Sequence, residues 1–231
     1  MNSGRDTILQ RVREALRHPA PFPGSHHCGQ SHAPETPADF RPWLPPVGPH
    51  PADWLRAFRE NFAALQGRFL HASDHESLTV QLRDLASEQN WKKIASLPDS
   101  PEIDLARTLG PEVMEVRRGY SVEEMETCDA AITGCDLLIA QTGSILVTSR
   151  SSGGRALTVF PPHHVVLANP TKLVPDLPEA FTYIERVYGT SPPSMIGFIT
   201  GASRTGDIER ILVLGAHGPR QLTVAFVGAV E

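Results

Sequence analysis

The sequence has few cysteines, and their number and spacing exclude the sites that cysteines usually build. They are Cys28, Cys128 and Cys135, and no two of them form a Cys-x-x-Cys pair. An iron-sulfur cluster or a structural zinc ion needs a complete set of thiolate or imidazole ligands, and a disulfide framework needs paired cysteines. We therefore expect ordinary thiols and no bound metal.

Long hydrophobic runs and clusters of basic residues are absent as well. No stretch approaches the roughly 20 apolar residues that cross a bilayer, and the first residues lack the apolar core of a signal peptide. The net charge is -5 and the basic residues are scattered, which argues against a nucleic-acid partner. No Gly-x-Gly-x-x-Gly fingerprint occurs. These absences predict a cytoplasmic protein that binds neither membranes nor nucleic acid and carries no cofactor.

Proline, by contrast, is abundant in one segment near the N-terminus. Ten prolines lie between residues 19 and 51, and a segment with so few backbone donors sustains neither a helix nor a central strand. Before it, Ser3 can cap a helix that runs to about Leu16. We therefore expect residues 1–50 to form a helix and a linker, and residues 51–231 to form the main domain.

Beyond residue 51, helix and strand patterns alternate. Trp54, Phe58 and Phe62 lie on one face of a predicted helix that Gly67 closes. Short apolar runs predict strands that alternate with further helical patterns, at residues 68–71, 93–97 and 113–116. This alternation is typical of an α/β fold with an open, mostly parallel sheet and helices on both faces.

The middle of the chain changes to a series of short strand patterns, at residues 130–133, 137–140, 145–148, 157–160 and 165–168. The turns between them are too short for crossover helices, so neighbouring strands are expected to pair antiparallel as an insert. A helix over residues 178–188 and strands over 195–199, 211–214 and 222–227 then complete the predicted sheet.

Three loops carry side chains suited to chemistry, and we expect them to meet at the carboxyl ends of the strands, where open α/β sheets bind ligands. The first is Gln141-Thr142-Gly143-Ser144. Its glycine permits close approach of the backbone to an anion or a carbonyl, and the hydroxyl groups beside it can donate. A hairpin turn that needs a glycine for its positive φ explains this loop equally well.

The second loop contains an arginine among hydroxyl and acidic side chains. Arg204 offers a planar fork for a carboxylate or a phosphate, and Asp207 could orient the guanidinium or act as a base. Alternatively, an acidic side chain of the loop pairs with Arg204 or Arg210 only to close it. The candidate ligand-binding residues here are Gly201, Ser203, Arg204, Thr205 and Glu209, with Asp207 as a catalytic candidate.

The third loop, residues 215–219, places His217 beside Gly218 after an apolar strand. An imidazole titrates near neutral pH and suits proton transfer or ligand recognition, although a histidine in such a turn can simply satisfy a carbonyl. Two other features are less specific. His163 and His164 are expected to pack in the core rather than bind a metal, and the basic loop 150–155 is either an anion lid or a solvated connection.

The second and third loops resemble the C-terminal signature of the LUD (lactate-utilization) domain, in particular its small members called lactate-utilization protein C or YkgG-like. That pattern reads roughly Gly-x-Ser-x-Thr-x-Asp-Ile-Glu, an apolar strand, then Gly-x-His-Gly-Pro, which residues 201–209 and 215–219 match. Upstream, residues 132–136, 139–144 and 161–164 fall in the order that the family uses. One departure is Gln141, which stands where relatives often carry Glu.

The resemblance implies the NagB/RpiA/CoA-transferase-like architecture and a role in the oxidation of L-lactate to pyruvate with iron-sulfur partner proteins. Because this chain has no cluster cysteines, we expect an accessory or small-molecule-binding component with a small anionic ligand. If the chain is itself catalytic, Asp207 and His217 are the candidates. The alternative is a free-standing enzyme of this fold acting on an acyl-CoA or a phosphorylated small molecule, although Gln141 removes one carboxylate nucleophile that CoA transfer would need.

Overall fold

The computed structural model describes residues 4–15, 17, 45–206, 212–215 and 217–230. The chain divides into two compact units, Met1–Phe40 and Arg41–Glu231. In the first unit, the predicted N-terminal helix is α1 (Gly4–Ala15). All other helices and strands belong to the second unit.

Six parallel strands form the main sheet, in the order β1-β12-β7-β4-β2-β3. They are β1 (Arg68–Ala72), β2 (Lys93–Ser96), β3 (Glu112–Glu115), β4 (Ala130–Thr133), β7 (His163–Ala168) and β12 (Gln221–Val227). The last strand along the chain, β12, lies between β1 and β7, and Val224, Ala225 and Phe226 are fully buried there. Strands buried on both faces appear in a sequence as continuous apolar runs, which is why the pattern predicted them.

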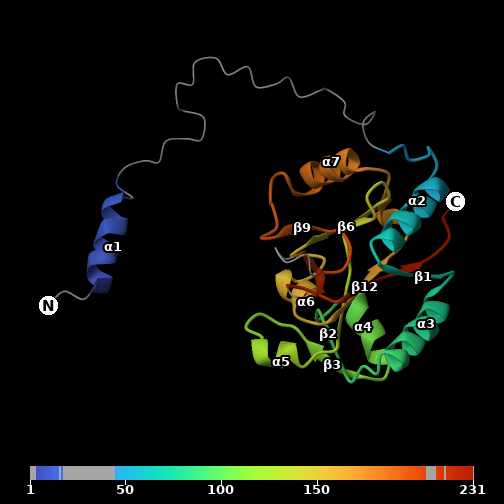
Figure 1. The fold of residues 1–231 in the computed structure, drawn as a ribbon, viewed down its shortest axis with the longest axis horizontal. Helices are drawn as coiled ribbons and strands as arrows, with labels where there is room; N and C mark the ends of the chain where they lie inside the picture. Colours follow the sequence, from blue (N-terminus) through green and yellow to red (C-terminus); the bar gives the residue numbers. More distant parts are fainter. Residues whose placement is uncertain (1–3, 16, 18–44, 207–211, 216, 231) are drawn as a thin grey trace, which may run out of the picture. The chain divides into compact units, whose positions relative to one another are not determined.

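Helices cover both faces of the main sheet, as predicted (Figure 1). α3 (His75–Glu88) and α4 (Pro101–Thr108) pack on one face. There, Leu82 of α3 and Ile94 of β2 belong to one buried hydrophobic cluster. α2 (Pro51–Ala64), α5 (Val122–Glu126) and α6 (Arg155–Val159) pack on the other face. Phe58 of α2 is fully buried in the core on that side. The mostly parallel α/β fold is therefore confirmed.

A second sheet of four strands packs on the α2 side, in the order β8-β5-β6-β9. Its strands are β5 (Leu137–Ile139), β6 (Ser144–Thr148), β8 (Leu173–Val174) and β9 (Ile196–Ile199). β6 pairs antiparallel with both β5 and β9, which confirms the antiparallel insert. The last helix, α7 (Leu177–Tyr188), covers the outer face of this sheet (Figure 1), where Ala180 packs against Leu137 and Ile139.

Two details of the predicted insert are wrong. The run 157–160 begins within helix α6, whose Leu157 is buried beside Ala131 of β4. β4 and β7 pair parallel as neighbours in the main sheet rather than antiparallel in the insert. The physical reason is that residues 134–162, with β5, β6 and α6, form the long crossover connection that two parallel strands require.

The prediction for residues 211–214 is also wrong in part. β11 (Leu212–Leu214) pairs antiparallel with β10 (Arg204–Gly206) in a separate two-stranded sheet, so it does not complete the main sheet. Residue 211 lies outside the described residues. Within the described part of the chain, no helix has the length and apolar character needed to cross a membrane.

Candidate functional site

The carboxyl ends of the parallel strands border a cleft of about 560 Å³, here called the carboxyl-edge cleft. Loops that follow β1, β2, β4 and β7 supply its walls. This is the position at which open α/β sheets bind ligands. The polar side chains that line it include His75, Ser100, Glu102, Ser151, Asn169 and Lys172.

Two helices begin at the carboxyl-edge cleft. α3 is capped by Asp74, whose carboxylate accepts the backbone N–H of Ser77 at 2.8 Å. α4 is capped by Ser100, whose hydroxyl oxygen accepts the backbone N–H of Ile103 at 3.3 Å. Because the amino end of a helix carries partial positive charge, both helices favour a negatively charged ligand at this edge of the sheet.

Lys172 and Glu102 bring opposite charges to the cleft. Lys172 ends the 3-10 turn η2 (Pro170–Lys172) after β7, and Glu102 lies in the first turn of α4. Both residues are half-buried, and neither forms an ion pair or hydrogen bond through its side chain within the described residues. A Cβ atom at Gly134 would lie 2.7 Å from Oε1 of Glu102, so a glycine after β4 leaves room for this carboxylate. The cleft thus offers an ammonium donor and a carboxylate acceptor to one ligand.

The loop 150–155, predicted as a lid or a solvated connection, supplies one wall of the cleft and is tied to its surroundings. The guanidinium of Arg150 lies 5.1 Å from the ring centroid of Tyr188 and donates to the carbonyl oxygen of Ser191 at 2.8 Å. Ser152 is fully buried, and its hydroxyl donates to the carbonyl oxygen of Thr148 at 2.8 Å. Arg150 therefore contributes positive charge from a defined position.

Asp136 is a buried carboxylate directly behind this wall, with only 4% of its surface exposed. It accepts the hydroxyl of Ser151 at 2.6 Å and the hydroxyl of Tyr188. Burial and the hydrogen bond to Asp136 raise the pKa of Tyr188 to about 12, so this hydroxyl remains a donor. The backbone N–H of Thr148 donates to Ser151 Oγ at 2.9 Å. Ser151 is therefore held from two sides where it lines the cleft.

Cys135 also lines the cleft, as a neutral thiol. Burial raises the pKa of Cys135 to about 12, and burial likewise raises the pKa of Cys128, between α5 and β4, to about 11. A cysteine attacks as the thiolate, so the raised pKa values argue against a nucleophilic role for either residue at neutral pH. In the described ranges, no group of three His, Cys, Asp or Glu side chains is placed to hold a metal ion. Cys28 lies outside them.

His163 and His164 open β7 and are buried on opposite faces of the main sheet. Nε2 of His163 lies 2.8 Å from Oγ1 of Thr223, and the ring packs edge-on against Trp91. Nε2 of His164 lies 2.8 Å from Oγ1 of Thr133. Burial lowers the pKa of His163 to about 4 and that of His164 to about 3. Both residues pack in the core, as predicted, and the lowered pKa values keep their rings neutral at neutral pH.

The turn 141–144 lies against the carboxyl end of α2, and none of its residues lines the carboxyl-edge cleft. Gly143 has a φ of 64°, and a Cβ atom there would lie 2.7 Å from the backbone nitrogen of Phe62. The hydroxyl oxygens of Ser144 and Thr200 are 2.8 Å apart. The glycine is thus required both by the turn and by the contact with α2.

Gln141 and Thr142 each have a buried side-chain oxygen without a hydrogen-bond donor among the described residues. Nε2 of Gln141 donates to the carbonyl oxygen of Pro45 at 2.9 Å. Oε1 of Gln141 and Oγ1 of Thr142 are buried and have no hydrogen-bond partner among the described residues. A buried oxygen without a donor costs free energy, which a donor from a ligand would recover. The ligand-binding role of this turn stays a prediction, and these two oxygens support it.

The signature loops lie at the amino ends of the parallel strands, so their predicted location is wrong. Arg204 donates to the carbonyl oxygen of Leu65, just before β1. The backbone N–H of Ser203 donates to the carbonyl oxygen of Pro219, just before β12, at 2.9 Å. The prediction assumed that residues 211–214 were a strand of the main sheet, whereas β11 pairs with β10 alone.

Other signature residues pack around the same contacts. A Cβ atom at Gly201 would lie 3.0 Å from the carbonyl oxygen of Leu65, and one at Gly218 would lie 3.2 Å from Cβ of Ser203. Thr205 lies in β10, and both Asp207 and Glu209 lie outside the described residues. The roles proposed for these residues therefore stay predictions.

His217 and Gly218 line a second cleft, of about 630 Å³, here called the amino-edge cleft. Glu126, Phe160 and Arg220 also line it. Arg204 and the turn 141–144 do not, so this cleft contains the histidine of the signature without its arginine fork.

Sequence reasoning missed most residues of the carboxyl-edge cleft. Glu102, Asn169 and Lys172 belong to no recognisable motif. The one feature of the sequence that could have indicated them is their position shortly after a strand of the main sheet, Glu102 after β2 and the other two after β7. Of the residues that line this cleft, only Arg150 and Ser151 belong to a loop that the sequence analysis named, with an anion lid and a solvated connection as its two interpretations.

Comparisons with known proteins agree with this architecture. The family model of the LUD domain matches residues 55–227. Lactate utilization protein C of Deinococcus radiodurans is 29% identical over 197 residues, which cover 83% of this chain and 90% of that protein. Lactate utilization protein C of Geobacillus thermodenitrificans is 26% identical over 230 residues, covering 93% and 92%. A crystal structure of a DUF162 family protein from Deinococcus radiodurans shares the fold, with a TM-score of 0.64 and 23% identity over 79% of this chain and 100% of that one.

Proposed function

Because this chain belongs to the LUD domain family, we propose that it acts in the cytoplasm in the utilization of L-lactate, as an accessory or small-molecule-binding component. The names of the relatives from Deinococcus radiodurans and Geobacillus thermodenitrificans support this role. In this proposal, iron-sulfur partner proteins carry the electrons of the oxidation of L-lactate to pyruvate. The cysteine count supports this division of labour, because the sequence has three cysteines and a cluster usually needs four thiolates.

The observation that carries the ligand class is that Lys172 and Glu102 line the same cleft, the carboxyl-edge cleft, and that neither side chain has a partner within the described residues. Lys172 would bind the carboxylate of a small 2-hydroxy acid, beside the amino ends of α3 and α4. Glu102 would accept the hydroxyl of the same ligand. Ser151, fixed by Asp136, would hold the wall of the cleft in place.

A second candidate function is a free-standing enzyme acting on an acyl-CoA or a phosphorylated small molecule. It is favoured by the volume of the cleft, about 560 Å³, which falls in the range of pockets for much larger ligands than a three-carbon acid. Helix amino ends and Lys172 would suit a phosphate as well as a carboxylate.

Growth on L-lactate tests the proposal. A host that lacks this gene should grow poorly on L-lactate and normally on pyruvate, and the intact gene should restore growth. Lys172→Gln should fail to restore it, whereas Lys92→Gln, which changes an exposed lysine outside the cleft, should succeed. His217→Ala and Asp207→Asn test the signature loops in the same host.

Each outcome has a different meaning, provided that the variants accumulate to the parental level. If the deletion strain grows on L-lactate at the parental rate and no other oxidase is present, the lactate role is wrong and the alternative enzyme becomes the leading hypothesis. If Lys172→Gln restores growth but His217→Ala does not, the ligand site belongs at the amino-edge cleft.

A further inference from the structure

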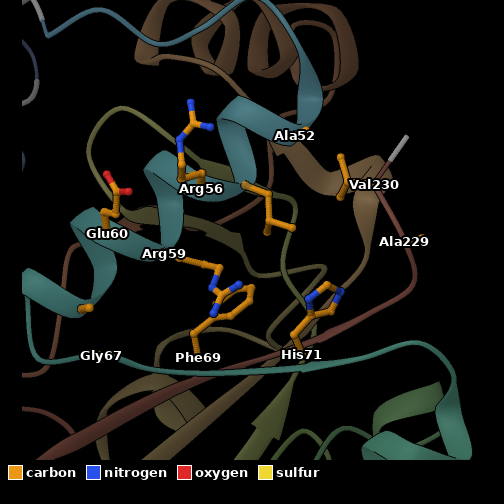
Figure 2. A pocket seen from close by; sticks show the side chains of 11 residues that line it. Ala52, Arg56, Arg59, Glu60, Gly67, Phe69, His71, Ala229 and Val230 are labelled. Carbon is orange, nitrogen blue, oxygen red and sulfur yellow. The ribbon is translucent and has the colours of Figure 1, made fainter.

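A third cavity, of about 780 Å³, lies between α2 and β1, the edge strand of the main sheet (Figure 2). It shares no lining residue with the carboxyl-edge cleft or the amino-edge cleft. Leu55, Phe69 and Val230 give it an apolar floor, and Arg56, Arg59 and His71 bring basic groups to its walls. This combination of an apolar surface with basic groups is suited to an amphipathic anion.

Arg59 is the basic group best placed for a ligand. Its guanidinium carbon lies 5.6 Å from the centroid of the Phe69 ring, and Figure 2 shows the side chain extending from α2 toward that ring. Within the residues that the structure describes, no side-chain or backbone acceptor binds this guanidinium. Arg56, about one turn away, also lines the cavity, but its guanidinium donates to Asp53 at 2.7 Å. Of these two arginines, Arg59 is therefore the one whose guanidinium N–H groups have no acceptor among the described residues and can donate to a ligand.

His71 lines the same cavity as Arg59. Residues two positions apart in a strand point to the same face, so His71 lies beside Phe69 on β1, with 6.3 Å between the two ring centroids. Its Nε2 lies 2.9 Å from the carbonyl oxygen of Gly228. A carbonyl can only accept, so this nitrogen carries the proton and Nδ1 is left for another partner. The ring packs edge-on against Phe226 at 5.3 Å, which fixes its orientation.

We propose that this cavity binds an organic carboxylate with a flat apolar body. The carboxylate lies on the fork of Arg59, and the apolar body covers Phe69 and Leu55. Inorganic phosphate fits less well, because it would leave the apolar floor exposed to water. Glu60 also lines the cavity, but Figure 2 shows it directed away from Phe69 and His71. The site is independent of the proposed role of the carboxyl-edge cleft.

Calorimetric titration of the full chain with benzoate tests the proposal, because benzoate combines a ring with a carboxylate. Benzamide keeps the ring and loses the charge, and acetate keeps the charge and loses the ring. Each should bind at least about tenfold more weakly than benzoate, since both parts of the site contribute. Equal binding of benzoate and benzamide, or of benzoate and acetate, would overturn the proposal.

A substitution on α2 locates the binding site. Arg59→Gln should weaken benzoate binding by about tenfold, as expected for one charged hydrogen-bonding group that is partly exposed to water. Arg186→Gln is the matched control and should leave the affinity unchanged, because Arg186 on α7 also lies over an aromatic ring, that of Tyr183, but does not line this cavity. Lys172→Gln should also leave it unchanged, which separates this site from the carboxyl-edge cleft. The proposal fails if Arg59→Gln binds benzoate as the parent does, or if Arg186→Gln or Lys172→Gln weakens binding to the same extent.

Discussion

Replacing His164 by glutamine should make the stability of the protein less dependent on pH. The folded ring is neutral because burial lowers the pKa of His164 to about 3, and its Nε2 lies 2.8 Å from Oγ1 of Thr133. The Thr133 hydroxyl donates to the carbonyl oxygen of Gly134, so it accepts from the ring. The side-chain amide of glutamine can donate in the same place without titrating.

The magnitude follows from the difference in proton binding between the folded and unfolded chains. The unfolded chain binds a proton at His164 below a pKa of about 6.5, whereas the folded chain does not until about 3. The free energy of unfolding is therefore highest above the pKa of the unfolded state, and it decreases as the pH falls below that value and His164 takes up a proton on unfolding. At about pH 5 the loss relative to neutral pH is about 2 kcal/mol for this histidine, and it is similar for His163, whose pKa is about 4.

Urea unfolding followed by tryptophan fluorescence at about pH 7.5 and about pH 5 measures this difference. The parent should lose about 2 kcal/mol more than His164→Gln between the two conditions. His75→Gln, which changes an exposed histidine, should retain the parental difference. Identical pH dependence in the parent and in His164→Gln would show that the buried ring does not carry this proton linkage.

Two further substitutions test contacts that hold the second sheet. Gly143→Ala should destabilise the fold by about 1–3 kcal/mol more than Gly119→Ala, because both glycines have positive φ but only Gly143 contacts another element; equal losses in urea unfolding would refute the contact with α2. Tyr188→Phe should cost about 1–3 kcal/mol, because it removes one of the two side-chain donors to buried Asp136. Tyr183→Phe, which removes a hydroxyl from the same helix, should cost less, and a larger loss for Tyr183→Phe than for Tyr188→Phe would contradict the assignment.

The strands of the main sheet could be predicted because their burial leaves a direct mark on the sequence. Ala130–Thr133 and Leu222–Val227 are apolar runs that only a covered strand requires, and Ser100 with Pro101 marks the start of α4. The run 157–160 could not be assigned in this way. A short buried helix and a short buried strand have the same composition, and only the packing of Leu157 beside β4 decides between them.

The position of the candidate site depended on a tertiary fact that no local pattern contains. The signature loops flank the strand at residues 212–214, and their place in the fold depends on which sheet that strand joins. Lys172 and Glu102 are far apart in the chain and line one cleft only because β2 and β7 belong to one parallel sheet. Their side-chain chemistry could be read from the sequence, but their place in a common cleft could not.

The place of β12 between β1 and β7 has a consequence for how the protein is made. β1 pairs with β12 along its whole length, with Arg68 opposite Thr223 and Ala72 opposite Val227. β1 is the first strand of the main sheet to be synthesised and β12 is the last, so β1 has no partner strand until β12 has been made. Until then, the facing edges of β1 and β7 have no partner and can pair with another chain. We expect nascent chains to need protection from aggregation until residues 221–227 have emerged, and we expect chains that end before them to be degraded rather than to accumulate as a smaller domain.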